Sequence, residues 1–167
     1  YPPAFHATGG NPGGFVSMTD PSGQWFWFDA PAVVLGNQSS AFGHAISFDM
    51  QVSASGAGAA DGVMLVGSGM TLHYETPAPA ATFTHFVVPL TPVGWRINDP
   101  VAGLEPTAAQ MLEVLGNLSA LRISGDWLDG TETAGLDNVV LSIPAPGALL
   151  LVLSGLACLR VVKRRSR

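Results

Sequence analysis

The sequence predicts an all-β fold, an antiparallel sandwich of two sheets with one short helix. About nine short segments rich in β-branched and aromatic residues are separated by turn residues, and the 167-residue chain has 20 glycines and 13 prolines. No helix recurs between the strands, which argues against a parallel α/β sheet. Apolar residues make up 47% of the chain and charged residues 11%, which is enough apolar material for a sizeable core.

The first part of the chain is expected to begin with turns. Residues 1–14 are rich in Pro and Gly, and Tyr1-Pro2-Pro3 is typical of a linker, which leaves open whether a first strand precedes it. Alternation predicts a strand over residues 15–19, followed by a turn from Asp20. The aromatic run at 24–30 predicts a second strand with Trp25 and Trp27 on one side, and we expect core on both sides of it.

The middle and end of the domain supply the remaining elements. Residues 44–53 give the clearest predicted strand, with Ile46, Phe48, Met50 and Val52 on one face. Thr107 followed by Gln110 predicts a capping box at the start of a helix over residues 106–116. An acidic loop is expected over 125–135. Further strands are expected at residues 62–68, 70–75, 82–90, 119–124 and 136–143.

Charge divides the chain into two parts. Residues 1–142 contain all twelve acidic residues and only two basic ones, Arg96 and Arg122, a net charge of −10, whereas residues 143–167 carry +5. Binding of nucleic acid through phosphate neutralisation needs clustered Lys and Arg, so no nucleic-acid partner is expected. We therefore predict a domain over residues 1–142 and an appended tail over 143–167. The single cysteine, Cys158, lies in the tail, so the domain has no disulfide.

Enzyme motifs are mostly absent. Gly67-Ser68-Gly69 lacks the spacing of a nucleophile elbow, and the four histidines form no HExxH pair. Three acids of the predicted loop, Asp126, Asp129 and Glu132, leave three alternatives open: a carboxylate pair for glycoside hydrolysis, a calcium site, or a solvated turn.

Aromatic side chains are the usual platforms for sugar rings. Trp127, in the predicted loop, is the first candidate for such a ligand-binding position and Trp95 the second, whereas Trp25 and Trp27 are expected in the core.

Four segments in order resemble the laminin B domain, also called laminin domain IV. They are TGGNPGGFVSMTDPSGQWFWFDAPAVVLGNQSSAFGHAISFDMQ (8–51), VVPLTPVGWR (87–96), EVLGNLSALRISGDW (113–127) and TAGLDNVVL (133–141). The resemblance implies a jelly-roll-like β-sandwich similar to carbohydrate-binding modules, in an extracellular, adhesive or structural setting, without catalysis. In such sandwiches an Asp on the last strand often holds a structural calcium ion. Asp137 is therefore the first choice for a Ca²⁺ ligand, with Asp20 or Asp49 as partners; alternatively its carboxylate caps a turn.

The tail has the composition of a membrane segment. Thirteen uncharged residues run from Gly147 to Leu159, and as a helix they span about 20 Å at 1.5 Å per residue, less than the bilayer core of about 30 Å. To span, Arg160 must snorkel to the interface, and the basic C-terminal end then lies in the cytoplasm with the domain outside. The alternative is a buried core helix with a solvated basic end.

The tail also resembles the PEP-CTERM sorting signal of bacterial surface proteins. A Pro-x-Pro motif, an apolar helix and an Arg-rich end follow one another, although Ala145 replaces the usual acid. The resemblance implies export, anchoring in the inner membrane in transit, processing by an exosortase, and delivery to the cell surface or beyond. The residues that carry it are Pro144, Ala145, Pro146, Arg160, Lys163, Arg164, Arg165 and Arg167.

Three functions remain in view from the sequence. The first is a non-catalytic exported surface module that associates with matrix polysaccharide or other envelope components. The second is a secreted glycoside-active enzyme that uses the carboxylates of the acidic loop. The third is a purely structural envelope protein with no saccharide ligand. A structural Ca²⁺ is the one cofactor considered.

Overall fold

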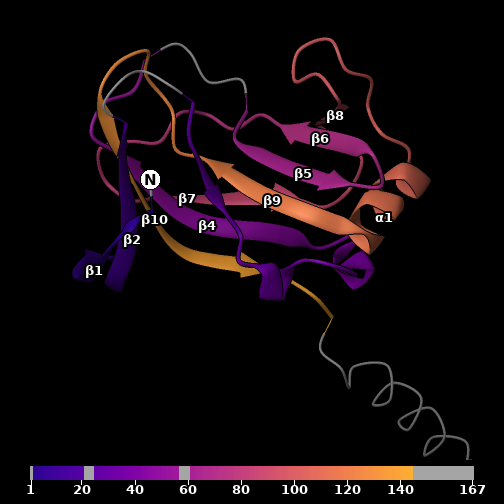
Figure 1. The fold of residues 1–167 in the computed structure, drawn as a ribbon, viewed down its shortest axis with the longest axis horizontal. Helices are drawn as coiled ribbons and strands as arrows, with labels where there is room; N and C mark the ends of the chain where they lie inside the picture. Colours follow the sequence, from indigo (N-terminus) through magenta and orange to yellow (C-terminus); the bar gives the residue numbers. More distant parts are fainter. Residues whose placement is uncertain (1, 21–24, 57–60, 145–167) are drawn as a thin grey trace, which may run out of the picture.

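Two five-stranded antiparallel sheets face each other in a computed structural model that describes residues 2–20, 25–56 and 61–144 (Figure 1). The predicted all-β sandwich with one short helix is thus confirmed. Sheet A has the strand order β1 (Ala4–Gly10), β2 (Gly13–Asp20), β10 (Glu132–Leu141), β4 (Ala45–Val52) and β7 (Thr84–Pro89). Sheet B has the order β3 (Trp27–Asp29), β9 (Leu118–Ser124), β5 (Val63–Gly67), β6 (Met70–Tyr74) and β8 (Trp95–Ile97).

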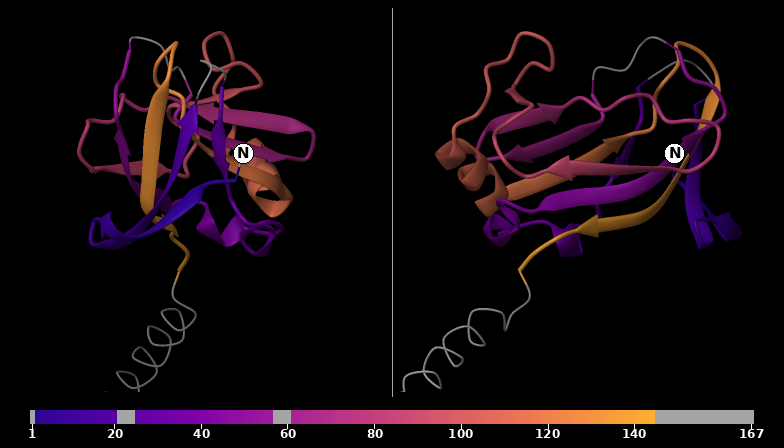
Figure 2. Two further views of the ribbon diagram at one scale, coloured as in Figure 1. Left: turned by 60° about the vertical axis from the view of Figure 1, so that its left-hand side comes forward. Right: turned by 180° about the vertical axis from the view of Figure 1, so that it is seen from behind.

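The core lies between the sheets and follows the alternation seen in the sequence. Ile46, Phe48, Met50 and Val52 of β4 are buried and face sheet B. The helix α1 (Ala108–Gly116) lies at the end of the sandwich opposite the β1–β2 hairpin (Figures 1 and 2). The predicted capping box at its start, between Thr107 and Gln110, is present. Two short 3₁₀ helices, η1 (Ala32–Val34) and η2 (Ser39–Ala41), complete the connection from β3 to β4.

Strand β1 corrects the prediction that residues 1–14 contain only turns. It forms a hairpin with β2 in which His6 lies opposite Phe15 and Gly10 opposite Gly13. Residues 4–9 of this edge strand are exposed, so the sequence carries no apolar alternation that would indicate a strand. The hairpin extends sheet A beyond β10 (Figure 1).

The last strand also differs from the prediction. Strand β10 begins at Glu132, inside the segment expected to be a loop, and lies between β2 and β4. Its register with β4 shifts between Asp137 and Val140, and Asn138 there has a φ of +51°. Such a bulge turns side chains in new directions, which is important for the polar network described below.

The aromatic run at 24–30 forms a shorter strand than predicted, and its two sides differ. Phe28 is buried and stacks edge to face with Phe26 at 6.2 Å. Trp25 has 69% of its surface exposed, so the expectation that it belongs to the core is wrong. Trp27 is half-buried and lines an apolar groove with residues of β2 and β10.

The predicted tail helix, the basic end and residues 145–167 as a whole lie outside the described residues. Among the described residues, no helix has the length and apolar character needed to cross a membrane.

Candidate functional site

Strand pairing separates the three aspartates that the sequence grouped as Ca²⁺ ligands. Asp137 of β10 lies directly opposite Asp49 of β4. Asp20, at the end of β2, lies opposite Glu132, five residues earlier on β10. Five residues of strand amount to about 17 Å and reverse the face, so Asp20 does not share a site with the other two.

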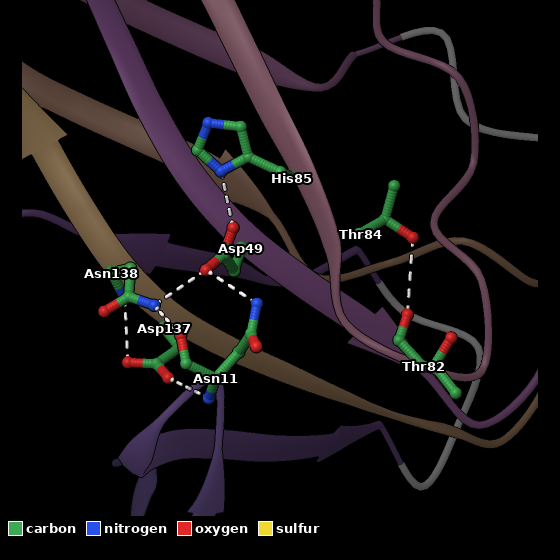
Figure 3. A network of polar contacts seen from close by, with 7 residues as sticks. All are labelled: Asn11, Asp49, Thr82, Thr84, His85, Asp137 and Asn138. Carbon is green, nitrogen blue, oxygen red and sulfur yellow. Dashed lines mark hydrogen bonds and ion pairs between the residues drawn. The ribbon is translucent and has the colours of Figure 1, made fainter.

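Asp49 is the centre of a hydrogen-bond network on the outer face of sheet A (Figure 3). Its side chain is buried, and Oδ1 accepts a bond of 2.6 Å from Nδ1 of His85. Oδ2 accepts bonds from Nδ2 of Asn138 at 2.7 Å and from Nδ2 of Asn11 at 3.3 Å. Burial by itself would raise the pKa of Asp49, but the bonds from Asn138, His85 and Asn11 and the charge of His85 outweigh it and lower the pKa.

Asp137 holds the tip of the β1–β2 hairpin against β10. Its Oδ2 accepts the backbone N–H of Asn11 at 2.7 Å and its Oδ1 that of Asn138 at 2.8 Å. The Asn138 side chain in turn donates to the carbonyl of Asn11. Gly10 allows this approach, because a Cβ there would lie 2.6 Å from Asp137 Oδ2. The alternative that Asp137 binds backbone N–H groups is therefore what the structure shows.

Neither Asn11 nor Asn138 was singled out from the sequence. Asn138 stands next to Asp137, and its positive φ is a conformation that Asn tolerates better than most residues. Asn11 lies 126 residues away from Asp137, and only the pairing of β1, β2 and β10 brings it into contact.

Aromatic rings continue the same outer face toward β1. The rings of His6 and Phe15 stack with centroids 4.5 Å apart, and Phe83 meets Phe15 edge to face at 5.5 Å. Residues opposite each other in a sheet share a face, and so do residues two apart. His6, Phe15, Ser17, Gly135, Gln51, Asp49 and His85 therefore form one row across the five strands of sheet A.

A second acidic group lies on the inner face of sheet A. One carboxylate oxygen from each of Asp20, Asp126 and Glu132 lies within 4.8 Å of the others. Asp20 and Glu132 are buried, and Asp126 is half-buried in the loop after β9. Burial is the main cause that raises the pKa values of Asp126 and Glu132. The charges of Asp20 and Asp129 raise the pKa of Asp126 further, although its hydrogen bond with Glu132 lowers it. The side chain of Asp126 raises the pKa of Glu132 further.

This group does not have the layout of a glycosidase. Glycoside hydrolysis needs two carboxyl groups on either side of an accessible bond. Glu132 has only 1% of its surface exposed, and its Oε1 already accepts the backbone N–H of Trp127 at 2.8 Å. Asp129, the third acid of the predicted loop, is exposed and lies outside the cluster.

The two tryptophans predicted as exposed sugar platforms are buried, which corrects that prediction. Trp95 is fully buried against Tyr74, with its Nε1 donating to the carbonyl of Pro89 at 2.8 Å. Trp127 is 2% exposed and donates to the carbonyl of Ser124 at 3.2 Å. Both indoles satisfy their single donor inside the protein, as buried tryptophans commonly do.

An apolar groove of about 510 Å³ opens where β3 meets β2 and β10. Its lining includes Trp27, Val16, Met18 and Val139. Among the described residues that line it, Asp29 is the one that carries a charge, and it pairs with Arg122 at 2.7 Å. The groove therefore adds apolar surface but no acid, base or nucleophile poised for chemistry.

Comparisons with known proteins agree with this architecture. The family described as Laminin B (Domain IV) matches residues 27–150. The L4b domain of human laminin alpha-2 is similar in structure, with a TM-score of 0.63 and 14% identity over 71% of this chain and 70% of that chain. An exo-beta-agarase is similar with a TM-score of 0.57 and 12% identity over 87% of this chain and 22% of that chain. At these identities the two structures show the fold alone. A search among curated proteins finds no match.

Proposed function

This chain belongs to the Laminin B (Domain IV) family, and on that premise we propose that it is a non-catalytic, exported surface module. Its partner is matrix polysaccharide or another component of the cell envelope. The observation that carries the proposal is the row of aromatic and polar side chains across the outer face of sheet A. A laminin-type module fits an extracellular setting, and the carboxylates of Glu132 and Asp49 are buried and already accept hydrogen bonds.

The row has the two components that sugar recognition needs. The stacked rings of His6 and Phe15 supply a flat apolar surface, against which the C–H groups of a sugar ring can pack. His85, with 59% of its side chain exposed, and Gln51 supply polar atoms for sugar hydroxyls farther along the face. Because the ligand is extended, a row across five strands can contact several sugar units.

Charge narrows the class of polysaccharide. Residues 1–142 carry a net charge of −10, so the domain repels polyanions at low ionic strength. A neutral polysaccharide is therefore favoured over an acidic one.

The tail supports export as part of the same proposal. Its Pro144-Ala145-Pro146 motif, apolar run and basic end suit a PEP-CTERM-type sorting signal. In that role, the tail anchors the chain in the inner membrane until an exosortase-type enzyme processes it at the motif. The domain would then reach the cell surface or the surrounding matrix.

Calorimetric titration of the full chain, kept in mild detergent, with neutral polysaccharides tests the function. We expect binding without release of reducing ends, and Phe15→Ala should weaken it about tenfold, or ~1.4 kcal/mol. Phe5→Ala is the matched control, since Phe5 is 73% exposed on the opposite face of β1. Release of reducing ends would favour the glycoside-active enzyme. Self-assembly of the chain with no binding of any polysaccharide would favour the purely structural envelope protein.

A further inference from the structure

Three acidic side chains from three separate elements meet at one end of the core. Asp20 is the last residue of β2, Asp126 follows β9 of the other sheet, and Glu132 is the first residue of β10. Glu132 shares its face of β10 with Ala134 and Leu136, both buried, so it points into the sandwich. Asp20 lies opposite Glu132 and points the same way. The cluster thus joins sheet A to the loop that leaves sheet B.

Glu132 is bound on one oxygen only. Its Oε1 accepts the N–H groups of Trp127 at 2.8 Å and Leu128 at 3.3 Å. Glu132 is 99% buried, and its Oε2 has no N–H or hydroxyl donor among the described residues. Its side chain also lies within hydrogen-bond reach of the Asp126 carboxyl group, which can share a bond with it only when one of the two is protonated. Buried carboxylate oxygens are normally paired, so Oε2 needs a positive or proton-donating neighbour.

No basic side chain is placed to fill that need among the described residues. Arg122 pairs with Asp29 on the exposed side of β9, and Arg96 lies on β8 at the edge of sheet B. The charged groups closest to the Glu132 carboxylate are those of Asp20 and Asp126, with one oxygen of each within 4.8 Å of one Glu132 oxygen. Ionised carboxylates accept hydrogen bonds and repel one another.

We infer that Asp20, Asp126 and Glu132 bind a divalent cation, with Ca²⁺ the best fit. Ca²⁺ takes six to eight oxygen ligands in flexible geometry, so three carboxylates with loop carbonyls and water suffice. The ion would connect the end of β2, the start of β10 and the loop after β9. This site is separate from the outer face proposed to bind polysaccharide, and neither proposal depends on the other.

The network around Asp49 and Asp137 is a poorer cation site than the cluster of Asp20, Asp126 and Glu132. Its carboxylates already accept bonds from side-chain and backbone N–H groups, and those donors would have to be displaced. The geometry therefore moves the calcium site from Asp137 to the inner cluster and retains only Asp20 of the three ligands expected from the sequence.

Terbium luminescence and thermal melting of the full chain test the inference after dialysis against EDTA. Tb³⁺ substitutes for Ca²⁺, and Trp127, whose N–H contacts Glu132, should sensitise its emission. We expect Ca²⁺ to compete with Tb³⁺ and to raise the melting temperature by several degrees at saturation. Asp126→Asn should abolish both effects, because Asp126 is the least buried of the three and its replacement leaves the core packed.

The matched control is Asp137→Asn, which should keep the Tb³⁺ emission and the Ca²⁺-dependent shift. A wild-type chain that responds to neither ion would overturn the inference and assign a shared proton to the cluster. The inference would also be wrong if Asp126→Asn kept the Tb³⁺ emission and the Ca²⁺-dependent shift in melting temperature. It would likewise be wrong if Asp137→Asn lost both effects while Asp126→Asn kept them.

Discussion

Strand β10 carries one acidic residue of each of two groups, Asp137 on the outer face and Glu132 on the inner face. On the outer face, Asp49 and Asp137 meet N–H donors from Asn11, Asn138 and His85. On the inner face, one oxygen of Glu132 accepts two backbone N–H groups, and the carboxylates of Asp20 and Asp126 each bring an oxygen within 4.8 Å of a Glu132 oxygen. The pKa of Asp49 is lowered, and the pKa values of Asp126 and Glu132 are raised. Both Asp49 and Glu132 are buried, so the difference comes from their neighbours. A buried carboxylate stabilises the fold in its ionised form when N–H donors surround it, but not when other carboxylates do.

The largest effect is expected on the outer face. Asp49→Asn keeps the size of the side chain but sets an NH₂ group against the donors of Asn138, Asn11 or His85. Because Asp49 is buried and its bonds are charge-assisted, we expect a loss of about 3 kcal/mol in the free energy of unfolding. Urea denaturation followed by the fluorescence of the buried Trp95 and Trp127 measures it.

Acid pH and a surface pair provide the checks on this prediction. Because the folded-state pKa of Asp49 is lowered, its contribution is present above the ordinary value of 3.8 and is lost as pH falls through the folded-state pKa. The difference in the free energy of unfolding between wild type and Asp49→Asn should therefore become smaller as the pH falls from 3.8 through the folded-state pKa of Asp49. Asp29→Asn, which removes an exposed ion pair with Arg122, should change stability by less than about 1 kcal/mol. A difference in the free energy of unfolding that stays constant into strong acid would contradict a stabilising role for the negative charge of Asp49.

The sequence predicts the parts of the fold that depend on local pattern. The alternation of β4 and the Thr107 capping box are confirmed, because both depend on residues a few positions apart. Strand β1 has no apolar face from which it could be predicted. The burial of Trp127 could not be predicted either, because its segment is polar. Both acidic groups depend on pairing across more than 80 residues, such as Asp20 with Glu132 and Asp49 with Asp137. The sequence could identify the acidic residues as candidates. Only the order of the strands in the sheet shows which of them lie together on the outer face and which on the inner face.

Glu132→Gln is expected to have the smallest effect on stability but gives the most direct test. Loss of the charge should stabilise the inner cluster in the absence of Ca²⁺, whereas loss of the Asp49 charge should destabilise the outer network. Gln keeps an oxygen for the N–H of Trp127 and places an NH₂ group beside the remaining carboxylates. In EDTA we expect the variant to gain about 1 kcal/mol in the free energy of unfolding. In saturating Ca²⁺ it should be less stable than wild type, because it loses an ion ligand. Urea denaturation of both proteins under both conditions measures the four values. The account predicts this reversal, and a Glu132→Gln effect of the same sign and size with and without Ca²⁺ would contradict it.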